Sequence, residues 1–396
     1  MSERKICVIG AGPVGLEAAL YARSLGLAVE VYEAGAVGNH LRAWGHVRMF
    51  TPWSMNVSSL GARRLGLARR EGNPTGAELV AEYLEPLARL PELADAVRER
   101  TRVVAASRAG FLKGDGVGDG TRAGRPFRLL LETPSGDEEA SCDVLLDASG
   151  VFGQPNALGA SGIPAPGERA CAVVTGLPDV RASRAAWEGK RVAVVGGGFS
   201  AATTVTALAA LGGTHVEWIT RGGTPPVREI ADDPLPERLG LARRANRLAT
   251  DLPSGFRHHP GAEVARLRDT GKGIEILLTT GGTVTVDAVV NQTGFRPDAS
   301  ITRELQVHHC YASEGPMNLA AALLGAAGGD CMSQTGFGPE SLASPEPDFF
   351  LLGHKSYGRN PEFLLRIGRE QVRDVFRLIT GNGELDLYEA EEAHAG

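Results

Sequence analysis

The sequence has few of the features of a membrane or nucleic-acid-binding protein. Among 396 residues, 41 lysines and arginines face 47 aspartates and glutamates, so the net charge is −6. A domain that binds nucleic acid normally carries a basic patch, and we expect no such partner. No run of about 18 apolar residues occurs, which predicts no membrane span. The first residues lead directly into a strand-like segment, which predicts no signal peptide.

Cysteines are few and lack a recognisable pattern. The five are Cys7, Cys142, Cys171, Cys310 and Cys331. No CxxC pair and no zinc-like spacing is present, so neither a metal site nor a redox-active dithiol is predicted. An odd number without a framework indicates reduced thiols and a cytoplasmic protein.

Glycine is abundant, with 52 residues that follow no three-residue period. The first cluster lies between a strand over 4–9 and a helical segment, and a second strand ends at Glu33. In this βαβ unit Gly10 permits the turn, Gly12 lets a pyrophosphate approach the backbone, and Gly15 allows close helix packing. Glu33 is placed to bind a ribose diol. The motif predicts a dinucleotide site, to which Pro13, Val14 and Ala34 also belong.

The same pattern occurs a second time. A strand over 191–195 leads to Gly196 and Gly198, followed by Phe199, Ser200 and Ala201 at the start of a helix. The next strand aligns Thr220 with Glu33 and places Arg221 after it. A guanidinium in place of a carboxylate suits a 2′-phosphate, which favours NADPH. If the strand ended at Glu217, that carboxylate would serve an unphosphorylated ribose and NADH would be the cofactor.

A third repeat closes each unit. The segments CDVLLDASG (142–150) and VDAVVNQTG (286–294) each run from an apolar strand to a small polar residue and a glycine. Ser149, Gly150, Thr293 and Gly294 are therefore expected near a cofactor, because the glycine lets the backbone pass close to it.

These motifs together resemble the flavoproteins with two dinucleotide-binding domains, most closely the flavin-containing monooxygenases and N-hydroxylases. The resemblance covers nearly the whole chain. It implies an α/β fold with two Rossmann-like, doubly wound domains: an FAD domain and an inserted NADPH domain. The monooxygenase fingerprint FxGxxxHxxx(F/Y/W) is missing, because the corresponding stretch reads PAPGERACAVVTGLPDV. Similarly, Gly353-His354 stands where the family has Gly-Asp.

The resemblance implies further flavin contacts. It places the backbone near Val103 against the adenine and His354 in a loop beside the flavin. The segment after Glu33 would run along the flavin, and it gathers His40, Trp44 and His46 close to Arg48, Trp53 and Asn56. We expect these side chains to form a wall for flavin or substrate. A C-terminal helix is expected to start with Asn360 as its N-cap and Pro361 as its first residue.

The expected domain limits follow from the same anchors. Residues 1–165 would form the first part of the FAD domain and 166–295 the NAD(P)H domain. Residues 296–380 would return to the FAD domain, and 381–396 would be a flexible acidic tail. The Gly- and Pro-rich segment 158–168 is expected to be a linker.

The resemblance implies an FAD-dependent, NADPH-consuming enzyme that acts on a small-molecule substrate. The main hypothesis is a single-component monooxygenase that uses molecular oxygen, through a C4a-peroxyflavin, to oxygenate an amine or sulfur nucleophile. The alternative is an NADPH-dependent reductase without a CxxC dithiol, acting on a low-molecular-weight disulfide, quinone or ferredoxin. A non-enzymatic redox sensor is a third reading. The sequence singles out no catalytic residue, and a homodimer is compatible with it.

Overall fold

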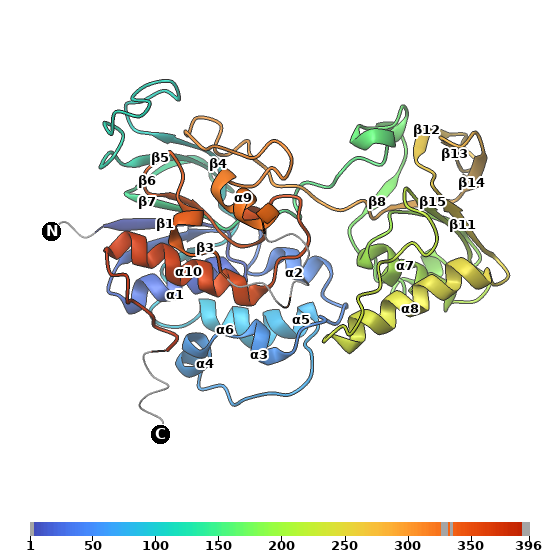
Figure 1. The fold of residues 1–396 in the computed structure, drawn as a ribbon, viewed down its shortest axis with the longest axis horizontal. Helices are drawn as coiled ribbons and strands as arrows, with labels where there is room; N and C mark the ends of the chain where they lie inside the picture. The colour runs from blue at the N-terminus through green and yellow to red at the C-terminus, as the bar shows by residue number, and fades with distance from the viewer. Residues whose placement is uncertain (1–3, 326–331, 333–335, 390–396) are drawn as a thin grey trace. The chain divides into compact units, whose positions relative to one another are not determined.

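The computed structural model describes residues 4–325, 332 and 336–389, which form two units (Figure 1). The first unit comprises Met1–Gly153 and Arg296–Gly396, and the second comprises Gln154–Phe295. The second unit is therefore an insertion in the first. The chain passes from one to the other after Gly153, before the break expected after residue 165.

A five-stranded parallel sheet forms the centre of the first unit. Its order is β16-β7-β1-β2-β3. The strands are β1 (Lys5–Ile9), β2 (Ala28–Tyr32), β3 (Val97–Arg98), β7 (Val144–Asp147) and β16 (Phe349–Leu351). β1 and β7 are apolar and almost continuously buried, as expected for parallel strands that are covered on both faces.

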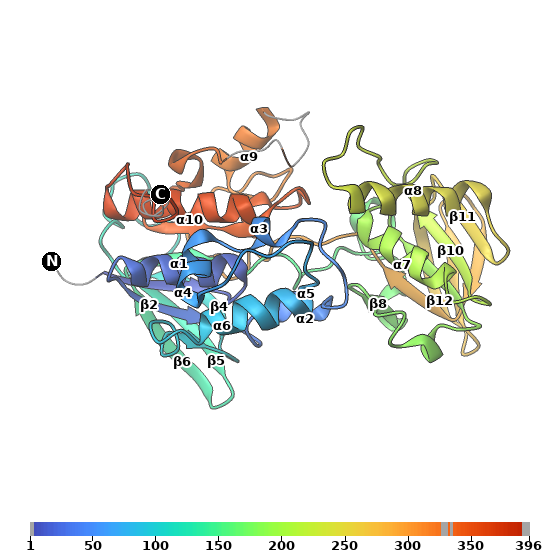
Figure 2. The same cartoon turned by 90° about the horizontal axis from the view of Figure 1, so that it is seen from below.

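Different layers cover the two faces of this sheet. Helices α1 (Pro13–Ser24) and α10 (Leu365–Thr380) pack against each other on one side (Figure 2). On the other side lies an antiparallel sheet of β4 (Arg102–Arg108), β5 (Phe127–Thr133) and β6 (Gly136–Cys142). In β5, buried and exposed residues alternate, which is the pattern of a strand with only one face in the core.

Short helices complete the first unit. They are α2 (Asn39–Ala43), α3 (Trp53–Asn56), α4 (Ser59–Leu65), α5 (Gly76–Leu79), the π-helical turn η1 (Val80–Leu84), α6 (Glu85–Ala88), α9 (Met317–Gly325), and the 3₁₀ turns η6 (Pro339–Leu342) and η7 (Gly353–Tyr357). None of the helices in the described part of the chain is long and apolar enough to span a bilayer.

The second unit repeats this plan. Its parallel sheet has the order β11-β10-β9-β15-β8. The strands are β8 (Val173–Thr175), β9 (Arg191–Val195), β10 (His215–Thr220), β11 (Phe256–Pro260) and β15 (Ala288–Asn291). An antiparallel sheet follows from β12 (Val264–Asp269), β13 (Ile274–Leu278) and β14 (Thr283–Val286), and the long helices are α7 (Phe199–Ala209) and α8 (Pro236–Asp251). Three 3₁₀ turns lie at η2 (Ala160–Gly162), η3 (Glu168–Ala170) and η4 (Arg184–Ala186).

The shared strand order confirms the predicted fold class, two Rossmann-like α/β units with the second inserted in the first. In each unit the first strand of the glycine motif lies between the strand that follows the first helix and the strand that ends in Ser-Gly or Thr-Gly. That arrangement brings the glycine turn and the later glycine to the same carboxyl edge of the sheet, where α/β proteins bind ligands.

Three local expectations were wrong. Segment 158–168 is no linker, because Leu158 and Ala165 are buried in the core of the second unit and their N–H groups donate to the Glu168 carboxylate at 3.0 and 2.7 Å. Helix α10 begins at Leu365, because the Asn360 side chain instead accepts the N–H of Glu362 in a local turn at 3.0 Å.

The third concerns the tail predicted as flexible over 381–396. Its residues 381–389 are described, and Leu385, Leu387 and Tyr388 pack against the main core. The N–H of Leu387 also donates to the hydroxyl of Tyr21 at 3.0 Å. Apolar residues between the acidic ones hold this part of the tail on α1.

A buried ion network fixes the antiparallel layer of the first unit. The Glu346 carboxylate accepts hydrogen bonds from Arg108 at 2.9 Å, from Arg122 at 2.8 Å and from the N–H of Gln306 at 2.8 Å. The three charged side chains are at most 2% exposed. The Arg108 guanidinium also lies 3.6 Å from the ring centre of Phe127. The network joins β4, the loop before β5 and the segment before β16.

Replacing the shared carboxylate should therefore destabilise the fold. We expect Glu346→Gln to lower the free energy of unfolding by about 3–5 kcal/mol, because two buried guanidinium groups lose the carboxylate that they share. Glu139→Gln, which breaks the exposed pair with Arg128, should leave stability nearly unchanged. Denaturant unfolding followed by circular dichroism measures both, and equal small losses would contradict the assignment.

Candidate active site

The three glycines of the first turn differ in what surrounds them. Gly10 has φ +99°, and a Cβ there would lie 2.9 Å from the Ala148 carbonyl oxygen. A Cβ on Gly15 would overlap the carbonyl oxygen of Gly10. A Cβ on Gly12 would meet nothing within 4 Å. Gly10 and Gly15 are therefore needed for packing, whereas Gly12 borders open space.

The open space lies at a helix terminus without a side-chain cap. Gly12 is the N-cap of α1, Pro13 is its first residue, and no side chain caps the helix. The first N–H groups of a helix lack intrahelical partners and carry a partial positive charge. The arrangement fits the pyrophosphate of a dinucleotide, and Gly12, Val14 and Gly15 would hold it.

Glu33 holds the turn from the end of β2. Its Oε2 accepts the N–H of Ala11 at 2.9 Å, and its Oε1 accepts the N–H of Gly35 at 2.8 Å. Each carboxylate oxygen has a second lone pair. Glu33 is thus positioned beside the turn with capacity left for the hydroxyls of a ribose, and Ala34, next to it, is exposed.

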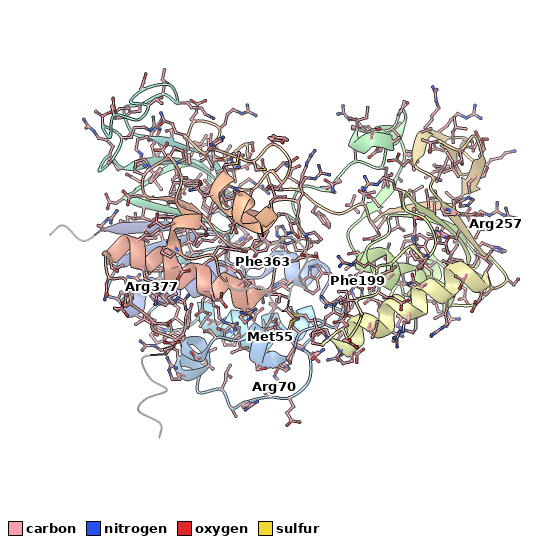
Figure 3. All side chains as sticks on the ribbon, in the orientation of Figure 1. Met55, Arg70, Phe199, Arg257, Phe363 and Arg377 are labelled. Atoms are coloured by element: carbon pink, nitrogen blue, oxygen red, sulfur yellow. The ribbon has the colours of Figure 1, made fainter. Side chains whose placement is uncertain are left out.

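The second glycine turn has the same form. Gly196 has φ +133° and lies against the carbonyl oxygen of Gln292, whereas a Cβ on Gly198 would meet nothing within 4 Å. Gly198 is the N-cap of α7, again with no side-chain cap. Phe199 (labelled in Figure 3), Ser200 and Ala201 form the first turn. Both units therefore present an uncapped helix next to an open glycine.

The ends of β2 and β10 differ in charge. β10 continues through Trp218 and Ile219 to Thr220, which is followed by the exposed Arg221. Glu217 lies within the strand, is 6% exposed and bonds the His259 ring at 2.8 Å. Its carboxylate is therefore occupied inside the unit, and the strand end offers a hydroxyl and a guanidinium.

The third repeat is a matched pair of side-chain turns. Asp147 Oδ1 accepts the N–H and the hydroxyl of Ser149 at 3.1 and 2.7 Å. Asn291 Oδ1 accepts the same two groups of Thr293 at 3.0 and 2.7 Å. Gly150 and Gly294, next in sequence, have φ of +72° and +92°. The repeat thus extends to Asp147 and Asn291, which the sequence reasoning did not select.

The two turns have different partners. Asn291 Nδ2 donates to the carbonyl of Asn156 at 2.8 Å. In the first unit, Lys355 of η7 donates to Asp147 Oδ2 at 2.6 Å and to Ser149 Oγ at 3.0 Å. Asp147 is 0% and Lys355 2% exposed. The first unit therefore holds a buried cation directly behind the Ser149-Gly150 turn.

An aromatic and imidazole cluster lies next to this turn. Phe152, 37% exposed, has its ring centre 5.9 Å from His40, 6.4 Å from Trp44 and 5.9 Å from His354. The ring of His354 also stacks on Phe363, which is labelled in Figure 3, with the ring centres 5.8 Å apart. A Cβ on Gly150 would lie 3.9 Å from His40 Nδ1. We call these five side chains the Phe152 cluster.

Burial favours the neutral form of both histidines in the Phe152 cluster. Burial lowers the pKa of His40, with Glu33 acting weakly in the opposite direction. Burial also lowers the pKa of His354, against a hydrogen bond with the backbone of Asn360. Neutral imidazoles and aromatic rings make a wall of low polarity next to the expected cofactor.

Other predicted residues lie elsewhere. His46 and Arg48 are exposed, and Trp53 is buried with Arg70 stacked 4.2 Å above its ring. Asn56 is buried and bonds Thr51 and Pro52. Of the residues expected to form the wall, His40 and Trp44 belong to the Phe152 cluster. The side chain of Val103 is 3% exposed in β4 and packs with the core between the two sheets, and the contact of its backbone with the adenine stays a prediction.

A narrow cavity lies under the first turn of α1. Pro13, Val14, Glu17, Tyr83 and Arg369 line it, and the space open to the centre of a water molecule is about 10 Å³, room for one water. Glu17 is 2% exposed, and burial raises its pKa. Tyr83 donates to Glu17 Oε2 at 3.2 Å, and Oε1 has no partner among the described residues. Burial thus favours the protonated form of the Glu17 carboxyl group.

Comparison with known families gives a match over residues 123–311 to the pyridine nucleotide-disulphide oxidoreductases. Comparison with curated proteins gives no match. Among solved structures, a bacillithiol disulfide reductase from Bacillus cereus is similar with a TM-score of 0.68 and 19% identity, covering 96% of this chain and 99% of that one. An ornithine N-hydroxylase from Kutzneria sp. 744 has a TM-score of 0.65 and 15% identity, with coverage of 96% and 99%.

A substituted form of a flavin monooxygenase from Stenotrophomonas maltophilia has a TM-score of 0.62 and 21% identity, again with coverage of 96% and 99%. At these identities each likeness concerns the fold. Together with the family match, it confirms the predicted resemblance to flavoproteins with two dinucleotide-binding domains, and FAD and NAD(P)H as the cofactors. Reductases and monooxygenases are both among the similar structures.

The glycine turn yields a first test of the cofactor site. We expect Gly12→Ala to leave the unfolding midpoint of the apoprotein unchanged and to weaken FAD binding at least about tenfold, since the methyl group enters the open space. Gly15→Ala should instead lower stability, by about 1–3 kcal/mol, because its methyl group meets backbone. Titration of the apoprotein with FAD and denaturant unfolding distinguish them. Unchanged FAD affinity in Gly12→Ala would refute the site.

The buried pair yields a second test. Lys355→Met leaves the Asp147 carboxylate buried without its cation and should cost about 3–5 kcal/mol in unfolding free energy. Adding Asp147→Asn restores neutrality, as at Asn291, and should recover most of that loss. Denaturant unfolding of the apoproteins measures both variants. If the double variant is no more stable than the single one, the ion pair is not what holds this turn.

Proposed function

We propose a specific activity for this chain, an FAD- and NAD(P)H-dependent oxidoreductase with two dinucleotide-binding domains: monooxygenation of a small-molecule amine or sulfur nucleophile. In this reaction NADPH, a proton, oxygen and the nucleophile give NADP⁺, water and the nucleophile carrying one oxygen atom. NADPH supplies the two electrons that reduce the second oxygen atom to water. The Phe152 cluster carries the proposal.

The Phe152 cluster supports it through its polarity. Reactive oxygen chemistry on a flavin needs a site from which water is excluded. Trp44, Phe152 and Phe363 are aromatic, and burial disfavours the charged form of the half-buried His40 and His354 imidazoles. The cluster adjoins Gly150. A Cβ on Gly353, next to His354, would lie 3.3 Å from Val14 on the first turn of α1. A substrate held there would be next to the cofactor turn.

The cysteines support a reaction without a protein dithiol. Cys7 and Cys142 are neighbours, but they are 0% and 2% exposed, and burial raises the pKa of Cys142 well above its ordinary value. Neither thiol is open to a substrate. Cys171 lies in the core of the second unit, and Cys331 lies outside the described residues.

The chain's own groups then have separate tasks. When bound, FAD supplies the two-electron chemistry that links NADPH to the acceptor. The uncapped start of α1 and Gly12 bind its pyrophosphate, and Glu33 its ribose. The Lys355 ammonium sits behind Ser149 and stabilises negative charge near the turn. In the second unit, Gly198 and the start of α7 bind the nicotinamide nucleotide, with Thr220 and Arg221 at the 2′-phosphate.

One observation favours a second candidate, a reductase of a small disulfide. Hydrogen bonds from Ser313 lower the pKa of the Cys310 thiol, which favours the reactive thiolate. Its loop packs against η7, because a Cβ on Gly315 would lie 2.6 Å from the carbonyl oxygen of Ser356. In that reaction NADPH and a proton would convert one disulfide into two thiols. Cys310 is only 4% exposed, so we rank this activity second.

The two activities differ in their electron acceptor. We expect NADPH oxidation by the purified yellow protein to require oxygen, and part of the consumed oxygen to appear in an oxidised amine or thioether rather than as hydrogen peroxide. The measurement follows NADPH, oxygen and peroxide together over a panel of amines and thioethers. NADPH oxidation without oxygen, driven by a small disulfide and lost in Cys310→Ser, would establish the reductase instead.

A further inference from the structure

His258 of β11 lies between two threonine hydroxyls at the end of β10. Its Nε2 is 2.8 Å from Thr220 Oγ1, and its Nδ1 is 3.2 Å from Thr224 Oγ1. Its ring is tilted at 42° against Trp218, with the ring centres 5.4 Å apart. Arg257, the residue before it, is exposed and points outward (Figure 3), so His258 faces the other side of the strand.

One arrangement of these hydrogen bonds places the ring proton on Nε2. Thr220 donates its only hydroxyl proton to the carbonyl of Gly222 at 3.1 Å. In this arrangement Thr220 accepts a hydrogen bond from His258, and Nε2 carries the ring proton. In the neutral ring Nδ1 is then an acceptor, and it takes the hydroxyl proton of Thr224. If Nδ1 gains a proton, it donates to Thr224, and the hydroxyl of Thr224 is free to donate elsewhere.

The loop that contains Thr224 carries exposed groups that can bind an anion. Arg221 and Thr224 are exposed, and Arg221 forms no ion pair with any acidic residue that the structure describes. A Cβ on Gly222 or Gly223 would meet nothing within 4 Å. A Cβ on Gly197, in the second glycine turn, would lie 3.2 Å from the carbonyl of Pro226 and 4.0 Å from Thr220. The loop therefore borders the nucleotide turn.

We propose that His258 is a specificity-determining residue for the 2′-phosphate of NADPH, and that binding of this phosphate adds a proton to Nδ1 and turns the Thr224 hydroxyl toward the ligand. The inference rests on the proposed NADPH site and adds two residues to it. Arg221 supplies fixed positive charge, and His258 supplies a second charge only when the dianion is present. NADH, which lacks the phosphate, gains nothing from this proton.

In the free protein, the groups around His258 do not stabilise a second proton on its ring. Burial is the main cause that lowers the pKa of His258, and His259 acts in the same direction. Glu217 of β10 is already bonded to His259. Helix α8, which packs on β11, buries one ionisable side chain, Arg238, and its partner is Asp233 at 2.7 Å. No carboxylate among these groups bonds His258, and burial favours the neutral ring in the free protein.

The affinity for the phosphorylated nucleotide depends on pH through this proton. The ring is neutral in the free protein, and a bound dianion raises its pKa, so binding takes up a proton. Affinity for the phosphorylated nucleotide therefore rises as pH falls through the bound-state pKa. Each unit by which the ligand raises that pKa increases the affinity about tenfold. The phosphate itself takes up a proton near about pH 6, so the effect is sought above that value.

Calorimetric titration of the FAD-loaded protein with NADP⁺ and NAD⁺, which do not reduce the flavin, tests the proposal. Between about pH 8.5 and about pH 7 we expect the ratio of NADP⁺ to NAD⁺ affinity to rise about three- to tenfold. Titrations in buffers of different ionisation enthalpy should show proton uptake with NADP⁺ and none with NAD⁺. In His258→Gln the ratio should be lower and independent of pH over this range.

Two further variants separate this role from a structural one. His259→Gln, which changes the adjacent ring bound to Glu217, should keep the proton uptake. Thr224→Val, at an exposed position, should lose most of the preference for NADP⁺ while NAD⁺ binds as before. Proton uptake that persists in His258→Gln, or an unchanged preference in Thr224→Val, would overturn the inference. Failure of both nucleotides to bind would overturn the proposed function itself.

Discussion

The first turns of α1 and α7 present backbone N–H groups that no side chain caps, each beside a glycine that borders open space. A helix end of this kind attracts an anion. The other elements of each unit hold this helix end in place. Parallel strands bring the glycine turn and the Ser149-Gly150 or Thr293-Gly294 turn to one edge, and tight packing at Gly10 and Gly196 fixes the direction in which the helix points.

Around this shared frame the two units differ mainly in charge. The first carries the Glu33 carboxylate at the end of β2 and the buried Lys355–Asp147 pair behind its second turn. The second carries Thr220 and Arg221 at the corresponding strand end and the neutral Asn291 in place of Asp147. These exchanges favour a ribose with free hydroxyls in the first unit and a phosphorylated one in the second, which is the physical basis for proposing FAD and NADPH respectively.

Much of the two proposed nucleotide sites was predictable from the sequence, because their residues lie in short local segments. The turns at Gly10 and Gly196, the ends of β2 and β10 and the paired final strands depend on residues close together in sequence. Asp147 and Asn291 were also within reach, since each stands two residues before the hydroxyl residue of the repeat. By contrast, Asn360 could be misjudged as a helix cap because its side chain closes a turn over Glu362 instead.

Other residues could not be identified from the sequence. Lys355 is 208 positions from Asp147, and no local pattern marks a lysine that will be buried. Phe152 is recognisable as part of a cluster only in the folded chain, where α2 and η7 bring His40 and His354 to its ring. The segment 158–168 was misjudged because glycine and proline indicate turns, but not whether Leu158 and Ala165 will be covered by β12 and its neighbours. Burial between distant segments decides all of these.

The central claim is that two nucleotides bind, one per unit, and exchange electrons. It is tested most directly by adding NADPH or NADH, without oxygen, to the protein purified with its flavin, and following the visible flavin absorbance. The account predicts that NADPH bleaches the flavin with one equivalent per bound flavin, and that NADH does so only at much higher concentration. A protein that holds no flavin, or a flavin that neither nucleotide reduces, would contradict it.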